Sequence, residues 1–238
     1  MTRQSFETAT GREISAVTAA EMRAVDRVAV EGIGLQLMQM MENAGRALAW
    51  HVRDLHTGSV AVVAGNGGNG GGGMVCARHL ANRGVPVQVV LDRTPDELTG
   101  AAAHQHRILA EMSVPVTTSE PSLETVADSV VVDALIGYGL SGTVRPPAST
   151  LIESMNDHSA RVLSLDVPSG TDATTGEPLG ATVTPDRTVT LALPKTGLIG
   201  VGGEVFVADI GIPATVYERL DIAYDCPFDD HDWLRLEG

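Results

Sequence analysis

VAVVAGNGGNGGGGMVCARHL, residues 60–80, is the stretch that decides the fold of this chain. Seven glycines and two asparagines lie between Gly65 and Gly73, after an apolar β-branched run and before a helical pattern. Glycine lets backbone N–H groups approach a ligand closely, and the helix that follows adds free donors at the positive end of its dipole. The pattern predicts a strand-to-helix turn that binds a phosphate. A flexible linker is the alternative, but linkers rarely stand between a buried strand and a helix.

The glycine-rich segment also matches the dinucleotide fingerprint G-x-G-x-x-G through Gly65, Gly67 and Gly70, and Asp92 ends the next apolar run. An acid at that distance would bind a ribose in an NAD(P)-dependent dehydrogenase. Further glycines continue where the fingerprint needs its first helical turn, and each costs a helix about 1 kcal/mol relative to alanine. We therefore interpret Asp92 as an ordinary strand-end acid and keep the dehydrogenase as an alternative function.

Composition excludes several classes of function. The net charge of −14 and the isoelectric point near 4.8 argue against binding to nucleic acid or to an anionic membrane surface, which requires clustered basic residues. No apolar run is long enough for a membrane span, and the polar start lacks a signal-peptide core. We expect a cytoplasmic protein. All but one of the 16 basic residues are arginine, and acid excess with so little lysine suggests a cytoplasm of high salt.

Helical and strand patterns alternate along residues 1–238 without a domain linker, which predicts one α/β domain with a doubly wound, mainly parallel sheet. Thr18 and Glu21 form a capping-box pattern at the start of the first helix. Helices are predicted over 18–31, 34–56, 74–83, 99–112 and 147–157, and strands over 59–64, 85–92, 114–117, 129–133, 161–166, 186–193 and 203–209.

Two acids stand at the ends of predicted strands and open into glycine-containing loops: Asp133 before ALIGYGLSGTVRPP and Asp166 before VPSGTD. Ligands of doubly wound sheets bind outside the carboxyl ends of the strands. We therefore expect Asp133, Asp166 and the glycine-rich segment to face one crevice. Lys195 is the only lysine, in PKTGL just after a strand, and we expect its compact ammonium to contact the ligand.

Together with MENAGR at 41–46 and DIGIP at 209–213, these motifs resemble the NAD(P)H-hydrate epimerase family, also called the YjeF N-terminal domain. The resemblance covers about 18–213 and leaves 214–238 as an acidic extension. It implies a Rossmann-like three-layer αβα sandwich, a homodimer, and interconversion of the R and S forms of hydrated NADH and NADPH. It also implies that dehydration of the substrate comes from a separate NAD(P)H-hydrate dehydratase.

The resemblance assigns roles to individual residues. Asn69, Asp133 and Ser169 would bind a potassium ion, which prefers such oxygen ligands. Asp166 would contact the substrate and, because the reacting carbon must become planar and cationic, we predict Asp166 as the catalytic group. The predicted substrate-binding residues are Gly68, Asn69, Gly70, Gly71 and Gly72 at the phosphates, Gly137, Tyr138, Gly139, Leu140, Ser141, Gly142 and Thr143 in the loop, and Asp166 and Lys195.

Two positions depart from the family pattern GxGNNGGDG. Gly68 replaces its first asparagine and Gly72 replaces its aspartate, while Tyr138 stands where a small residue is frequent. The aspartate is a candidate acid–base group. A nucleotide-binding module of the same fold with impaired catalysis is therefore the second alternative.

Overall fold

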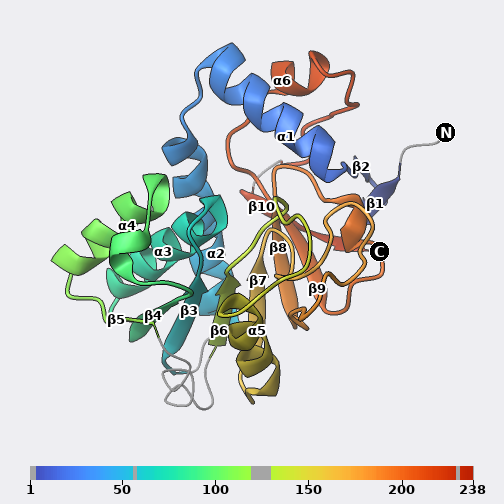
Figure 1. Ribbon diagram of the computed structural model, residues 1–238. Coiled ribbons are helices and arrows are strands. Elements are labelled where there is room, and N and C mark those ends of the chain that lie inside the picture. The colour runs from blue at the N-terminus through green and yellow to red at the C-terminus, as the bar shows by residue number, and fades with distance from the viewer. Residues whose placement is uncertain (1–3, 56–57, 119–129, 229–230, 238) are drawn as a thin grey trace.

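The computed structural model describes residues 4–55, 58–118, 130–228 and 231–237 (Figure 1). Within these residues one sheet of ten strands has the order β2-β1-β10-β9-β8-β7-β6-β3-β4-β5. The strands are β1 (Ser5–Thr8), β2 (Glu13–Ser15), β3 (Val60–Ala64), β4 (Val87–Leu91), β5 (Val116–Thr117), β6 (Val130–Ala134), β7 (Arg161–Leu165), β8 (Arg187–Leu191), β9 (Glu204–Ala208) and β10 (Trp233–Glu237).

The seven strands from β9 to β5 in this order are parallel to one another. Numbered in chain order from β3, the first six follow the order 3-2-1-4-5-6 of a Rossmann fold, in which the direction of winding reverses between β3 and β6. The predicted fold class, a Rossmann-like αβα sandwich with a mainly parallel sheet, is confirmed. Ligands of such sheets bind at the reversal point, outside the carboxyl ends of the strands.

Helices cover both faces of the sheet. Helices α2 (Leu37–Leu55), α3 (Gly68–Ala81) and α4 (Gly100–Glu111) lie on one face and α5 (Ala148–Asp157) on the other (Figure 1). Alternate residues of β3 point to the two faces: Val60 and Val62 join the core under α3, and Val63 joins the core under α5. A strand buried on both sides needs an unbroken apolar run, and VAVVA supplies it.

The N-terminal helix α1 (Ala19–Arg27) begins at the predicted capping box of Thr18 and Glu21. The helix predicted over 18–31 changes character after Arg27, where Val28–Ile33 form a π-helix that Gly34 ends at a φ of 85°. Figure 1 shows α1 beside the short helix α6 (Ala214–Glu218) at the top of the molecule, beyond one end of the sheet. Among the helices that the structure describes, none has the length and apolar character of a membrane span.

The start of α3 differs from the prediction. We expected a loop through Gly73 and a helix from residue 74, but the helix begins at Gly68. The glycines allow close packing: a Cβ on Gly73 would lie 2.4 Å from the Cβ of Ala134, and one on Gly45 of α2 would lie 2.4 Å from Val75. Close contact with the sheet and with α2 outweighs the low helix propensity of glycine.

The two ends of the chain were expected to lie outside the core, yet β1, β2 and β10 extend the same sheet in antiparallel pairing. With four and three residues, β1 and β2 are too short for a clear periodic signal. Most other predicted boundaries agree with the structure to within two residues, and α2 begins three residues late. Residues 56 and 129, at the ends of two predicted elements, lie outside the described residues.

Candidate active site

A cavity of about 770 Å³ lies at the carboxyl ends of β3, β4, β6 and β7. Its wall is completed by α1 and α2 and by the N-terminus of α3. The volume is within the range typical of small-molecule sites. The polar residues that line it include Arg23, Asp26, Asn66, Asn69, Asp92, Arg93, Arg145, Asp166 and Lys195.

The N-terminus of α3 opens into the cavity. Gly67 is its N-cap residue, and Gly67, Gly68, Asn69 and Gly72 line the cavity. The first N–H groups of a helix have no intrahelical acceptor and carry partial positive charge, so they can bind an anion. A Cβ on Gly68 would meet nothing within 4 Å, which leaves the backbone there open to a ligand.

Gly70 and Gly71, predicted to bind the substrate, are buried and do not line the cavity. A Cβ on Gly70 would lie 1.8 Å from the carbonyl oxygen of Gly65, and one on Gly71 would lie 2.7 Å from the sulfur of Met41. Their lack of a side chain therefore serves the packing of the strand-to-helix turn and of α3 against α2.

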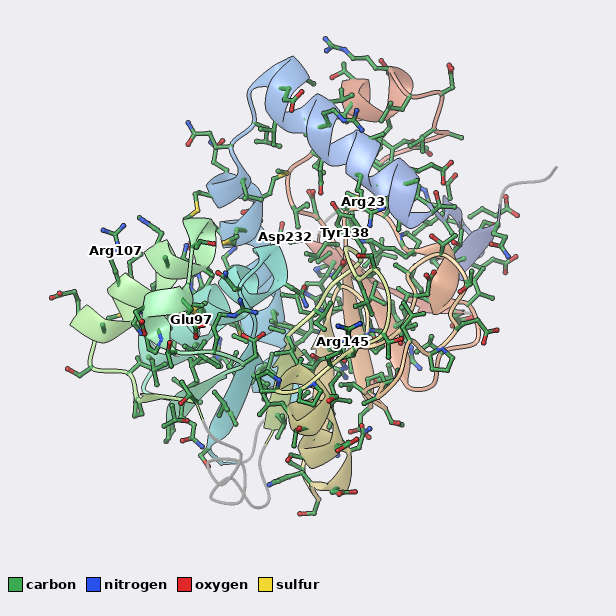
Figure 2. The ribbon with its side chains drawn as sticks, in the orientation of Figure 1. Arg23, Glu97, Arg107, Tyr138, Arg145 and Asp232 are labelled. Atoms are coloured by element: carbon green, nitrogen blue, oxygen red, sulfur yellow. The ribbon has the colours of Figure 1, made fainter. Side chains whose placement is uncertain are left out.

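The loop after β6 covers a second side of the cavity. Gly137, Tyr138, Gly139, Leu140 and Thr143 line the cavity, as predicted for substrate-binding residues, whereas the exposed Ser141 and Gly142 do not. The backbone N–H of Tyr138 donates to Asp166 Oδ2 at 3.1 Å, and its hydroxyl donates to Asp26 of α1. Figure 2 shows Tyr138 close to Arg23 of the same helix. Tyr138 thus connects α1 to the end of β7.

Asp166 and Lys195 form a buried ion pair in the cavity wall. The side chains are only 4 % and 1 % exposed, and Lys195 Nζ donates to Asp166 Oδ1. The other two contacts of the ammonium are Leu191 O at 2.9 Å and Thr190 Oγ1 at 3.3 Å. Since an ammonium has three N–H donors, protein acceptors already use all of them. Lys195 therefore holds Asp166 rather than offering a free donor to a ligand.

Asp166 has a backbone φ of 71°, in the left-handed region. This conformation is uncommon for a residue with a Cβ, and such residues gather at functional sites. Here it directs one carboxylate oxygen to Lys195 and the other to the loop, where a Cβ on Gly137 would lie 3.2 Å from Asp166 Oδ2. The predicted catalytic residue is thus fixed on both oxygens at the edge of the cavity.

Asp133 and Ser169 lie behind the cavity wall and do not line it. Asp133 is fully buried and accepts bonds from Ser164 Oγ and Ser169 N, both at 2.8 Å, and from Ser169 Oγ at 2.5 Å. Burial raises the pKa of Asp133, and these hydrogen bonds oppose the rise. Two of the three predicted potassium ligands are thus brought together, and the third, Asn69, lies in the cavity wall.

The family model described as "YjeF-related protein N-terminus" matches residues 37–197. The chain belongs to this YjeF-related family. The NAD(P)H-hydrate epimerase of Dehalogenimonas lykanthroporepellens is 45% identical to it over 91% of this chain and 90% of that protein. The bifunctional NAD(P)H-hydrate repair enzyme Nnr of Salinibacter ruber is 40% identical over 85% of this chain, which spans only 42% of that enzyme.

A solved structure agrees with the family assignment. The crystal structure of yeast ynu0 superposes with a TM-score of 0.83 at 26% identity, over 94% of this chain and 100% of that one. The resemblance of the sequence motifs to the YjeF-related family is confirmed.

The donor set fits the potassium ion that the resemblance to this family implied. Ser169 Oγ lies 2.5 Å from Asp133 Oδ1 and 3.1 Å from Ile136 O, so a carboxylate, a hydroxyl and a carbonyl oxygen converge. The buried Nδ2 of Asn69 has no hydrogen-bond partner among the described residues. With the amide turned over, its oxygen would take this unpartnered position and could ligate a cation.

Asp26 also lines the cavity of this YjeF-related chain, although it was not among the predicted site residues. Its carboxylate is mostly buried, which raises its pKa, while the bond from Tyr138 and the charge of Lys195 oppose the rise. Burial and the adjacent Asp26 also raise the pKa of the Tyr138 hydroxyl. The helical spacing could have indicated this residue. Asp26 comes four residues after Met22, which is 2% exposed, so the two side chains share the buried face of α1.

Proposed function

We propose that this protein is an NAD(P)H-hydrate epimerase, an isomerase that interconverts the R and S forms of hydrated NADH and NADPH. Family membership and the name of the relative that is 45% identical support the activity. The observation that carries it is the shared cavity, into which both the Asp166–Lys195 pair and the N-terminus of α3 open. One end can bind a diphosphate while the other faces the reacting ring.

Epimerisation requires the hydrated carbon of the nicotinamide ring to become planar. The C–O bond breaks with its electron pair, the departing oxygen takes a proton and leaves as water, and the ring nitrogen supplies electrons for an iminium-like cation. Water adds to the other face and releases a proton, so the net change is in configuration alone. Asp166 would stabilise the cation and carry the proton, a role that contributes about 10²–10⁴-fold.

Lys195 would act as a positioning residue. Its ammonium fixes one oxygen of Asp166 and supplies the opposite charge in a site where an unpaired charge would be costly. Asp166 Oδ2 is the oxygen turned toward the loop that covers the cavity. We place the reacting ring against this oxygen.

The remaining contacts belong to the same proposal. Gly68, Asn69 and Gly72 would bind the phosphates, and Gly137–Thr143 would cover the substrate. Asn69, Asp133 and Ser169 would hold a potassium ion, whose charge would offset the negative charge of the diphosphate. We also propose that the protein is a cytoplasmic homodimer. It would cooperate with a separate NAD(P)H-hydrate dehydratase, and the bifunctional name of relatives such as the Salinibacter ruber enzyme supports this cooperation.

The test starts from the pure R form of hydrated NADH and follows the S form by chromatography, with and without protein, in high KCl. Acceleration above the spontaneous rate is expected, and Asp166→Asn should remove most of it. Binding without acceleration, together with turnover gained by Gly72→Asp, would favour the impaired module instead. Oxidation of NADH in the presence of a carbonyl substrate, without epimerisation, would favour a dehydrogenase.

A further inference from the structure

One wall of the cavity has no role in the reaction described so far: Asp92 and Arg93 at the end of β4. Leu91 pairs with Ala64 at the end of β3, and the N–H of Asp92 points to Ala64 O at 3.4 Å. Asp92 therefore lies directly beside the start of the glycine-rich segment, at the same edge of the sheet.

The segment after Arg93 is fixed to the glycine-rich segment by a side chain. Asn66 Oδ1 accepts a hydrogen bond from Thr99 N at 2.8 Å, and Asn66 also lines the cavity. Asp92 and the N-terminus of α3 are thus parts of one continuous wall. In a sheet with this strand order, a carboxylate at the end of the strand next to the glycine turn is placed to bind a ribose hydroxyl of a dinucleotide.

The charges around Asp92 bear on which ribose fits. Arg93 holds the carboxylate in a bidentate pair, with Nε to Oδ1 at 2.9 Å and Nη2 to Oδ2 at 2.8 Å. Two further carboxylates follow at once, Asp96 and Glu97, and hydrogen bonds to Thr94 lower the pKa of both. The segment from Asp92 to Glu97 thus carries three carboxylates and one guanidinium, which is paired with Asp92.

We propose that Asp92, held in place by Arg93, is the subsite for the adenosine ribose and selects the dinucleotide without a 2′-phosphate. This inference rests on the proposed function and names which of its two substrates the site prefers. Each carboxylate oxygen keeps a lone pair for a ribose hydroxyl while Arg93 occupies the other. A 2′-phosphate would place further negative charge beside Asp92, which already occupies Nε and Nη2 of Arg93.

The probes are ADP-ribose and 2′-phospho-ADP-ribose, which lack the nicotinamide ring and differ only in the group at issue. Calorimetric titration of the full chain should show ADP-ribose binding at least about tenfold more tightly. The same ratio is expected in kcat/KM for hydrated NADH over hydrated NADPH. Because exposed charges are screened by salt, the binding ratio should shrink between low and high KCl.

Variants separate the roles of the two residues. Asp92→Asn keeps the shape, removes the charge and frees Arg93, so 2′-phospho-ADP-ribose should bind more tightly and the ratio should fall to about one or below. Arg93→Ala should weaken ADP-ribose without improving the phosphorylated probe, since it removes the local cation. Asp157→Asn, at the exposed end of α5, changes the net charge equally and should leave the ratio unchanged.

The two probes also distinguish failure of the ribose subsite from failure of the proposed function. Equal binding of both probes, or a ratio in Asp92→Asn equal to that of the wild type, overturns the ribose subsite and leaves the epimerase proposal standing. Binding of neither probe overturns the subsite and also removes the dinucleotide cavity from the proposed function. A folded Asp92→Asn protein is verified by its unchanged circular dichroism spectrum, and Arg93→Ala supplies an independent variant if it does not fold.

Discussion

Lys195 donates a hydrogen bond to Asp166 at a place where neither side chain is more than 4 % exposed. A buried charge is tolerated when a partner of opposite sign and further hydrogen bonds satisfy it. Lys195 meets this condition with two acceptors at the end of β8, Thr190 and Leu191. The pair therefore makes the predicted catalytic carboxylate part of what stabilises the fold.

Lys195→Met should lower the free energy of unfolding by about 3–5 kcal/mol, because it leaves Asp166 buried without a counter-charge. Adding Asp166→Asn to this variant should recover part of the loss. Urea unfolding of the two single variants and the double variant measures the coupling. Strictly additive losses would show that the two side chains stabilise the fold independently.

Lys195→Arg should also impair the protein, although it keeps the charge. The planar guanidinium needs more room than the fully buried site provides and cannot repeat the three contacts of the ammonium. Stability and epimerase rate should both fall. Arg161→Lys, the reverse exchange at an exposed position, serves as the control and should change neither.

Asp166→Asn should reduce the rate of epimerisation by about 10²–10⁴-fold, since the amide keeps the shape but cannot offset a developing positive charge. Affinity for ADP-ribose should remain, because the carboxylate acts at the other end of the substrate. Single-turnover kinetics and calorimetry on the same preparation separate the two. A rate within twofold of the wild type would remove Asp166 from its catalytic role.

Asp26→Asn tests the raised pKa of the carboxyl that faces Tyr138, Lys195 and Asp166. An acid whose pKa is higher in the folded state favours folding while protonated, and this advantage is lost as the pH rises through the folded value. The variant should therefore gain stability relative to the wild type at pH 8 and gain little below pH 3.8. Urea titrations at both ends of this range measure the difference. A gain that does not depend on pH would contradict the assigned cause.

Two alanine substitutions in α3 should have opposite effects. Gly73→Ala places a Cβ 2.4 Å from Ala134 and should destabilise the fold by about 1–3 kcal/mol. Gly68→Ala, in the first turn of the same helix, meets nothing within 4 Å and should be neutral or stabilising by up to about 1 kcal/mol. Thermal unfolding measures both. The added methyl group would point into open space at the helix start, where the phosphate is predicted to bind. Gly68→Ala therefore also tests the predicted contact between Gly68 and the phosphate.

The parallel half of the sheet could be predicted because its central strands are buried on both faces and give apolar runs such as VAVVA in β3 and the three valines before Asp133 in β6. The crevice followed from the same pattern, since both Asp166 and the glycine-rich segment stand at strand ends. The start of α3 could not be predicted from propensity. Gly70 and Gly73 are explained by contacts with Gly65 and Ala134, which only the folded chain brings near.

The candidate site was predicted in part. Asp166, Asn69 and Tyr138 line the cavity as expected, whereas Asp133 and Ser169 lie behind its wall. Sequence patterns place residues at strand ends but do not say which way each side chain points. Asp26 was not predicted because its partner Tyr138 is 112 residues away, and no local sequence pattern joins the two.

The antiparallel end of the sheet can form only late in translation. β10 lies between β9 and β1, so β1 and β2 can join the rest of the sheet only after β10 is in place. The residues that line the cavity, from Met22 to Ile210, are all translated earlier than β10. On the ribosome, the edge of β1 that faces β10 therefore stays without its strand partner while the parallel strands assemble, until Trp233–Glu237 is translated.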